Sequence, residues 1–290
     1  MKAIAKLLSH SPRLRNTLKT AWQCWRDGGV IPVTVTQINH GGILIGKRVL
    51  ITGGSAGIGK AIAKKCLSEG AEVVITGRDP NKLENAKNEL NSNLLYTLVW
   101  DVSDVSIAST KIKDIVMLLN GDIDILVNNA GILGGHRNFL DLDEDGWDKI
   151  TSVNSKGLLF ATQAVCRRWI NNKYKGKIIN MSSMRGVLGC VDGPYGMSKW
   201  GIIGLTQGLG LKMAKHGIQV NAIAPGIINT ESIAIKGIDT KENAYLPYVP
   251  VSRIGLSEEI AEIAIFLMSD AANYIVGQTI VCDGGYSLKV

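Results

Sequence analysis

The chain has 290 residues, of which 46% are hydrophobic and 20% charged, an ordinary composition for a globular protein with a sizeable core. Its net charge is +7, but +5 lies in residues 1–27, so the nearly neutral remainder argues against nucleic-acid binding. Five scattered cysteines without a CxxC pair argue against a disulfide framework or a metal site and favour a reducing, cytoplasmic compartment.

Residues 1–27 are predicted to form a basic amphipathic helix. Apolar residues recur there at steps of three and four, from Ile4 and Leu7 to Trp22 and Trp25. Three interpretations stay open: packing on its own domain or a sister subunit, contact with a membrane surface, or a removable targeting peptide. Residues 28–46 resemble an extended linker, so we place an N-terminal extension at 1–45 and the main domain at 46–290.

From Lys47 onward, short β-branched runs alternate with longer helical stretches. The predicted strands are RVLIT, EVVIT, YTLVW, IDILVNN, GKIINMSS, IQVNAIAP and TIVCD. One predicted helix follows the first strand and ends at about Leu67. The other predicted helices span residues 80–90, 104–119, 144–172, 195–215 and 257–268. Strands that are apolar on both faces and alternate with helices indicate a parallel sheet covered on each side. The sequence therefore predicts a doubly wound α/β domain with seven mostly parallel strands.

The turn after the first strand, TGGSAGIG, is a candidate phosphate-binding loop. Its glycines are spaced GxxxGxG between a strand and a helix, as such a loop requires. Glycine lets the backbone approach a pyrophosphate, and the N-terminus of the following helix adds favourable partial charge. We expect cofactor contacts from Gly53, Ser55, Ala56, Gly57, Ile58 and Gly59.

The tip of the second strand should meet the adenosine ribose of a bound dinucleotide. The chain has Gly77 there, followed by Arg78 and Asp79. A guanidinium can hold a 2′-phosphate with two N–H bonds, whereas a carboxylate would bind the 2′-hydroxyl and repel a phosphate. We therefore predict NADP(H) as the preferred cofactor, with NAD(H) as the alternative, although Arg78 could also be a solvated loop residue.

Two further groups of candidates follow the third and fourth strands. Asp101, beside Val102, lies where its side chain could reach the adenine edge. The segment NNAG contributes Asn129, Ala130 and Gly131 at the same edge of the sheet. A structural role in these turns is as strongly favoured as direct contact with a cofactor.

These segments together resemble the short-chain dehydrogenase/reductase family, in its compact single-domain branch. The matching segments are TGGSAGIG, the Asp101 motif, NNAG, Asn154, the strand ending in NMSS, YGMSK, NAIAPGIINT and the ending TIVCDGG. The resemblance implies a Rossmann-type fold, NAD(P)-dependent oxidation or reduction at CH–OH groups, and a homo-tetramer or homo-dimer. It also implies cofactor contacts after the sixth strand, by Pro225, Gly226, Ile228 and Thr230.

The segment YGMSK places Tyr195 and Lys199 on one side of a helix. Hydride transfer to or from a carbinol needs a group that exchanges the hydroxyl proton, and a nearby ammonium favours the phenolate of a tyrosine. The resemblance implies that Tyr195 is the general acid/base, that Lys199 also binds the nicotinamide ribose, and that Asn154 holds a proton-relaying water. The strand motif assigns the substrate oxygen to Ser183, whereas counting back from Tyr195 favours Ser182.

We therefore expect an NADP(H)-dependent carbonyl reductase or alcohol dehydrogenase that acts on a small-molecule substrate. Leu133, Met184, Cys190 and Val191 are expected to form pocket walls, and residues 231–250 to form a lid. Two rival hypotheses remain: a nucleotide-binding sensor or scaffold without turnover, and the same reductase held at a membrane surface by its N-terminal helix.

Overall fold

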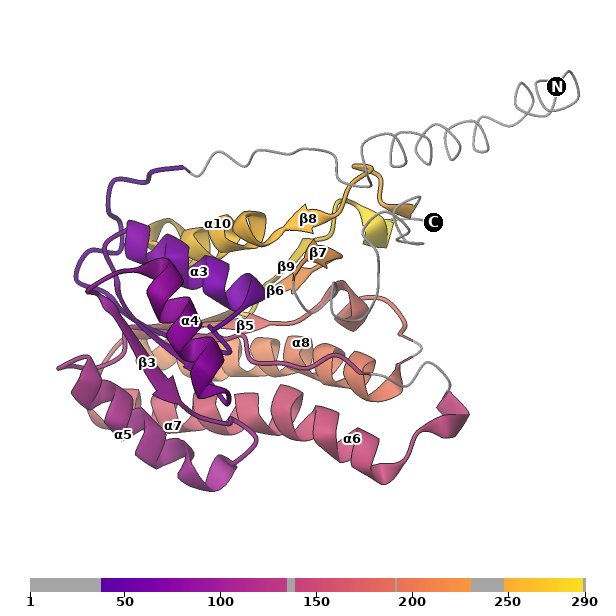
Figure 1. Cartoon of the computed structure of the whole chain (residues 1–290), viewed down its shortest axis with the longest axis horizontal. Helices are drawn as coiled ribbons and strands as arrows, with labels where there is room; N and C mark the ends of the chain where they lie inside the picture. Colours follow the sequence, from indigo (N-terminus) through magenta and orange to yellow (C-terminus); the bar gives the residue numbers. More distant parts are fainter. Residues whose placement is uncertain (1–37, 135–138, 191, 231–247, 289–290) are drawn as a thin grey trace, which may run out of the picture.

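Figure 1 shows the computed structural model of the chain, which describes residues 38–134, 139–190, 192–230 and 248–288. Its central sheet has seven parallel strands in the order β3-β2-β1-β4-β5-β6-β9. These strands are β1 (Arg48–Thr52), β2 (Glu72–Gly77), β3 (Leu95–Val99), β4 (Ile125–Asn128), β5 (Gly176–Met181), β6 (Ile218–Pro225) and β9 (Thr279–Cys282). The predicted parallel sheet of seven strands is confirmed.

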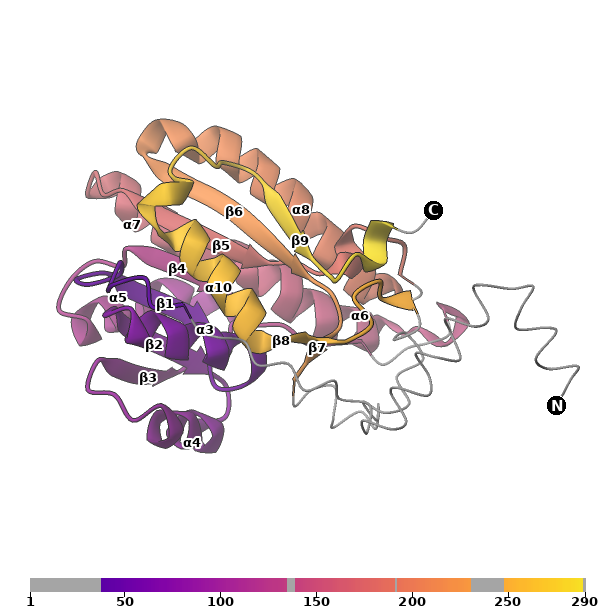
Figure 2. The same cartoon turned by 90° about the horizontal axis from the view of Figure 1, so that it is seen from above.

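Helices cover both faces of this sheet (Figure 1, Figure 2). One face carries α3 (Gly57–Ser68), α4 (Pro80–Leu90) and α10 (Ser257–Met268), and the other carries α5 (Ala108–Leu118), α7 (Leu158–Asn171) and α8 (Gly193–Met213). Successive residues of β1 enter opposite cores, since Val49 and Ile51 pack under α3 and α10 while Leu50 packs under α5 and α7. Strands of this kind must be apolar on both faces, which explains the unbroken β-branched runs.

The direction of strand addition reverses between β1 and β4. The chain adds β2 and β3 on one side of β1, and β4, β5 and β6 on the other. Connections that leave neighbouring strands in opposite directions open a crevice at the carboxyl ends of those strands, where doubly wound folds bind ligands. The predicted site segments after β1, β4, β5 and β6 all lie at this edge.

The predicted long helix around residues 144–172 is confirmed, but its middle turn is π-helical rather than α-helical. The chain forms α6 (Glu144–Thr151), a π-helical segment η3 (Ser152–Gly157) and then α7. Gly157 packs so closely on the turn after β3 that an added Cβ would lie 2.7 Å from the carbonyl oxygen of Val102. Tertiary packing therefore widens the helix at a point where helical periodicity gives no signal.

Several short elements complete the described chain. Strands β7 (Ile228–Asn229) and β8 (Gly255–Leu256) form a second, two-stranded parallel sheet. Short 3₁₀ segments are η1 (Val105–Ile107), η2 (Phe139–Asp141), η4 (Met184–Gly186), η5 (Ala214–His216), η7 (Asp270–Ala272) and η8 (Tyr286–Leu288).

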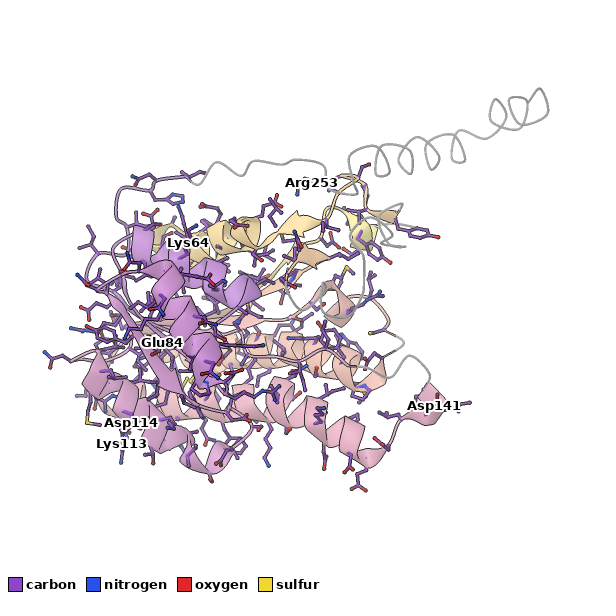
Figure 3. The ribbon with its side chains drawn as sticks, in the orientation of Figure 1. Lys64, Glu84, Lys113, Asp114, Asp141 and Arg253 are labelled. Carbon is purple, nitrogen blue, oxygen red and sulfur yellow. The ribbon has the colours of Figure 1, made fainter. Side chains whose placement is uncertain are left out.

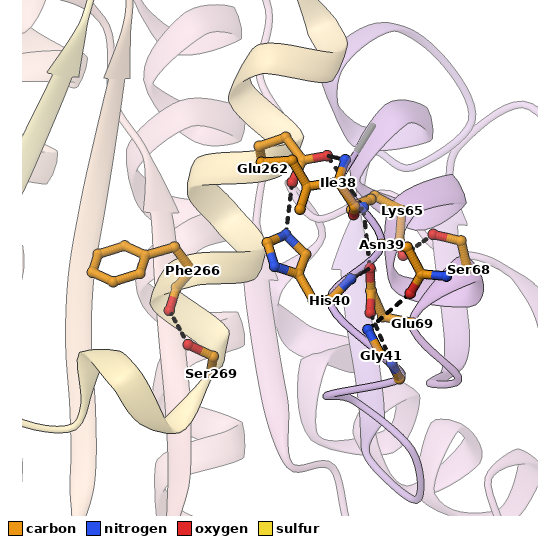
Figure 4. Close-up of polar contacts among 11 residues, drawn as sticks. Ile38, Asn39, His40, Gly41, Lys65, Ser68, Glu69, Glu262, Phe266 and Ser269 are labelled. Carbon is orange, nitrogen blue, oxygen red and sulfur yellow. Dashed lines mark hydrogen bonds and ion pairs between the residues drawn. The ribbon is translucent and has the colours of Figure 1, made fainter. Parts of the chain in front are cut away.

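A buried ionic cluster attaches the segment before β1 to α3 and α10 (Figure 4). Lys65 Nζ lies 3.1 Å from Glu69 Oε1 and 3.2 Å from Glu262 Oε1, and it also donates to the carbonyl oxygen of Ile38. The backbone N–H of His40 donates to Glu69 at 3.1 Å, and His40 Nε2 lies 3.0 Å from Glu262 Oε2. We call His40, Lys65, Glu69 and Glu262 the N-terminal clasp.

Some predictions concern residues outside the described ranges. These are the helix over residues 1–27, most of the linker up to residue 37, the pocket wall at Val191 and nearly all of the lid. Across the described ranges, no helix is both long and apolar enough to span a membrane.

Candidate active site

A cavity of about 290 Å³ lies at the carboxyl edge of the sheet, between the glycine loop and the start of α8. Fourteen of the predicted site residues line it: Gly53, Ala56, Gly57, Ile58, Asn129, Ala130, Gly131, Ser183, Tyr195, Lys199, Pro225, Gly226, Ile228 and Thr230. Leu133, a predicted pocket wall, also lines it, together with Ile132, Met181 and Ser182. Six other predicted residues do not line it: Ser55, Gly59, Arg78, Asp101, Val102 and Asn154.

The glycine loop has the geometry that a pyrophosphate needs. Gly53 and Gly57 have φ of +64° and +52°, a left-handed conformation that strains other residues. Ala56 is the N-cap of α3 and offers no side-chain acceptor, and the first-turn residues Gly57 and Ile58 line the cavity with it. Gly59 differs, because an added Cβ would lie 2.4 Å from Asn129 Nδ2. Its role is close packing beneath the loop, and the loop fits a dinucleotide phosphate.

The tip of β2 separates the two side chains that compete for the ribose. Asp79 is the N-cap of α4, where Oδ1 accepts from the N–H groups of Asn81 at 2.9 Å and Lys82 at 3.2 Å. Arg78 is exposed and makes no hydrogen bond or ion pair within the described part of the chain. The carboxylate is therefore occupied by the helix cap, while the guanidinium is available to an anion.

The residues after β3 and β4 make structural hydrogen bonds. Asp101 Oδ1 accepts from the N–H and hydroxyl of Ser103 at 2.9 and 2.7 Å, which closes the turn. Asn129 Nδ2 donates to the carbonyl oxygens of Thr52 at 3.1 Å and Gly53 at 2.8 Å, and so fixes the glycine loop. These contacts support the structural interpretation of both motifs, while direct cofactor contact stays a prediction.

The two serines after β5 have different surroundings. The hydroxyl of Ser182 donates to the carbonyl oxygen of Lys199 at 2.7 Å, inside the protein. Ser183 accepts from the N–H of Arg185 at 3.1 Å and lines the same cavity as Tyr195, whose pKa it lowers. The Ser182 hydroxyl is thus already used inside the protein, and the assignment of the substrate oxygen to Ser183 stays a prediction.

Burial dominates the electrostatics of Tyr195 and Lys199. Lys199 is 6% exposed, and burial lowers the pKa of its ammonium to about 8. Burial raises the pKa of Tyr195, and the hydrogen bond with Ser183 and the charge of Arg185 oppose that rise. Lys199 Nζ lies 5.8 Å from the centre of the Tyr195 ring. The predicted lowering of the tyrosine pKa by this lysine stays a prediction.

Lys199 also supplies a test of whether a nicotinamide ribose fits the site. Its ammonium carries three N–H donors, but it makes one hydrogen bond within the described ranges, to the carbonyl oxygen of Met181 at 2.9 Å. Buried donors without partners are costly. The hydroxyls of a ribose would satisfy the two remaining donors, so the residues present fit this part of a dinucleotide.

Asn154 lies in η3 with its side chain 1% exposed. Its Oδ1 accepts from the N–H of Ile132 at 2.8 Å, and its Nδ2 donates to the carbonyl oxygen of Ile132 at 3.0 Å and to Ser198 Oγ at 3.2 Å. The side chain therefore fixes the loop after β4. The predicted proton-relay role stays a prediction.

Asp192 has a capping role beside the candidate site that the sequence interpretation missed. It is the N-cap of α8, which begins two residues before the predicted helix start at Tyr195. The signal was present in the sequence, since an aspartate followed two residues later by proline is typical of a helix N-terminus.

Comparison with known proteins shows which sequences share this architecture. A family profile described as "Enoyl-(Acyl carrier protein) reductase" matches residues 53–287. A 3-oxoacyl-[acyl-carrier-protein] reductase of Aquifex aeolicus is 35% identical over 83% of this chain and 98% of its own length. A protein of Bacillus subtilis named as a 2,4-dienoyl-CoA reductase is 38% identical over 84% of this chain and 97% of its own. A solved structure from Agrobacterium tumefaciens, assigned as a 2-deoxy-D-gluconate 3-dehydrogenase with bound NADP, is 36% identical with a TM-score of 0.76, covering 85% of this chain and 98% of its own.

Proposed function

Because the chain belongs to the short-chain dehydrogenase/reductase family of NAD(P)-dependent oxidoreductases, we propose that it transfers a hydride between NADP(H) and a secondary alcohol or ketone. One observation carries this proposal. Ser183, Tyr195 and Lys199 line the same cavity as the glycine loop, so proton exchange and dinucleotide binding share one space. Asn154 supports that space from behind the loop after β4.

The side chains suggest how the reaction proceeds. A bound nicotinamide supplies or accepts the hydride. In reduction, Ser183 and Tyr195 hydrogen-bond the carbonyl oxygen, and the Tyr195 phenol gives that oxygen its proton as negative charge develops there. In oxidation, the phenolate takes the hydroxyl proton. The buried Lys199 ammonium stabilises the phenolate and binds the ribose, and it orients the reactants by doing so.

NADP(H) is the proposed preferred cofactor. The guanidinium of Arg78, which has no partner among the described residues, and the capping role of Asp79 support it. The Agrobacterium tumefaciens structure with bound NADP adds support from a relative.

The proposal is tested with Tyr195→Phe, which keeps the ring and removes the exchangeable proton. We expect kcat to fall about a thousandfold while NADPH binding, measured by fluorescence titration, is unchanged. The substrate panel contains 3-oxoacyl thioesters, 2-enoyl thioesters and hydroxy acids, because the relatives' names span these classes. Turnover retained by the variant would contradict the proposal, and a wild-type chain that binds NADPH but neither reduces nor oxidises any member of the panel would support the sensor hypothesis.

We also propose that the chain forms a homo-oligomer through α8. Met197, Trp200 and Leu211 are 59%, 72% and 85% exposed along one side of this helix, and an added Cβ at Gly204 would meet open space. A second hollow, of about 640 Å³, lies between α6, α7 and α8 and contains none of the catalytic side chains. An exposed apolar helix face beside a hollow is typical of a protein–protein interface. Membrane contact by residues 1–27 stays a prediction.

A further inference from the structure

The backbone of Tyr195 is held at both of its polar groups. Asp192 Oδ1 accepts from the N–H of Tyr195 at 3.3 Å. Pro194 has no N–H, so the N-cap carboxylate bonds directly to the residue that carries the phenol. On the other side, Ser198 Oγ donates to the carbonyl oxygen of Tyr195 at 2.7 Å. The first turn of α8 is thus fixed on both sides of its tyrosine.

The two residues that bond the Tyr195 backbone, Asp192 and Ser198, both connect it to the loop after β4. Ser198 Oγ accepts from Asn154 Nδ2, and Asn154 bonds both backbone polar groups of Ile132. The carboxylate of Asp192 lies against Gly134, where an added Cβ would be 1.6 Å from Oδ2. Ile132 and Gly134 are two residues apart in the loop after β4. This loop is therefore connected to the backbone of Tyr195 twice, through Asn154 and Ser198 and through Asp192.

We propose that Asp192 is a positioning residue for Tyr195, and that position 134 must be glycine so that the Asp192 carboxylate can reach the first turn of α8. This inference rests on the proposed acid/base role of Tyr195. By holding the backbone of Tyr195, Asp192 sets where the phenol lies relative to Ser183 in the shared cavity. The negative charge of Asp192 also favours the protonated form of that phenol.

The effect of the Asp192 carboxylate on the pKa of Tyr195 has to be seen beside the effects of the other groups around the phenol. Burial, the Cys190 thiol and Asp192 raise the pKa of Tyr195, while Ser183 and Arg185 lower it. The ammonium of Lys199 also faces the ring, from one helical turn further along α8. A carboxylate close to a phenol favours its protonated form, which is the form that reduction requires. Removing the Asp192 charge alone should therefore move the pH profile of kcat for reduction to lower pH.

The test separates the cap from the charge with three variants. Asp192→Ala removes both, Gly134→Ala displaces the carboxylate, and Asp192→Asn keeps a good capping group without the charge. We expect Asp192→Ala and Gly134→Ala each to lower kcat about fivefold to tenfold, with unchanged affinity for NADPH. The double variant should be no worse than Asp192→Ala, because both changes remove the same contact. Gly189→Ala is the matched control, since an added Cβ there meets no described atom within 4 Å.

Asp192→Asn provides a readout that a purely structural role would not change. Its kcat should recover to within about threefold of wild type, because asparagine caps as well as aspartate. The pH at which kcat for reduction declines should fall by about half a unit to one unit, because the carboxylate charge is gone. This variant keeps the cap, so it decides the question even if Asp192→Ala does not fold.

The outcomes distinguish this inference from the proposed function. Wild-type kcat in Asp192→Ala and Gly134→Ala, or an unmoved pH profile in Asp192→Asn, would overturn the positioning role while Tyr195→Phe remained inactive. Full turnover in Tyr195→Phe would overturn the proposed function, and the role of Asp192 with it.

Discussion

Lys199 shows how the site uses burial at the scale of a single residue. A lysine that is 6% exposed and makes a single hydrogen bond to the described residues loses hydration that this bond replaces only in part. The lowered pKa, about 8, expresses that loss. Such an arrangement weakens the folded state, as expected for a residue kept for the ribose and phenolate contacts that we propose for it.

Arg78 carries the prediction on cofactor choice. Arg78→Ala should weaken NADPH binding about tenfold to a hundredfold, because a charge-assisted hydrogen bond to the 2′-phosphate is lost. NADH lacks that phosphate, so its affinity should be unchanged. Fluorescence titration with both dinucleotides gives the ratio of NADPH to NADH affinity.

The control for Arg78 is Lys87→Ala, which removes a cation from the last turn of α4. Lys87 lies outside the tip of β2, so both affinities should match those of wild type. An unchanged ratio of NADPH to NADH affinity in Arg78→Ala would show that Arg78 does not contact the phosphate.

At the scale of elements, the strands were predictable because each is a short β-branched run bounded by glycine or polar residues. The helices over residues 80–90 and 257–268 were equally clear, since they carry start signals and an apolar face. The π-helical segment was not predictable, because it depends on the contact between Gly157 and the backbone at Val102. The surroundings of Ser182 and Ser183 likewise follow from where β5 ends against α8, which local sequence does not encode.

The N-terminal clasp gives a prediction for the element that precedes β1. Lys65→Met should lower the free energy of unfolding by about 3 kcal/mol, because Glu69 and Glu262 lose the cation between them. Lys64→Met removes the same charge from the neighbouring exposed position on α3 (Figure 3) and should change stability by less than about 0.5 kcal/mol. Urea unfolding measures both, and equal effects would contradict a role for the clasp.

The N-terminal clasp also predicts how the difference in unfolding free energy between wild type and Lys65→Met depends on pH. Burial alone would raise the pKa of Glu69, but the N–H of His40 and the ammonium of Lys65 lower this pKa below its ordinary value. Burial would likewise raise the pKa of Glu262, and the His40 side chain and the Lys65 ammonium lower it. The contribution of these carboxylates is therefore fully present above the ordinary glutamate pKa and is lost as pH falls through the lower folded value. The gap between wild type and Lys65→Met should narrow below about pH 4.

At the scale of the whole molecule, α8 belongs both to the candidate active site and to the proposed subunit interface. Its first turns carry Tyr195 and Lys199 into the cavity, while its outer side exposes Trp200 and Leu211. A partner packed on that side would bury apolar surface and restrain the helix that positions the phenol. Assembly would then stabilise the same element that Asp192 fixes at its N-terminus.

Leu211→Arg tests this assembly without touching the cavity. Leu211 is 85% exposed, so a charge there costs an isolated chain little, but it would be buried without a partner in an interface through α8. We expect sedimentation velocity to show an oligomer for the wild-type chain and mostly monomer for Leu211→Arg. Met117→Arg, at a 70% exposed apolar position on α5, should assemble as wild type does. A monomeric wild-type chain, or an oligomer that Leu211→Arg leaves intact, would show that α8 is not the interface.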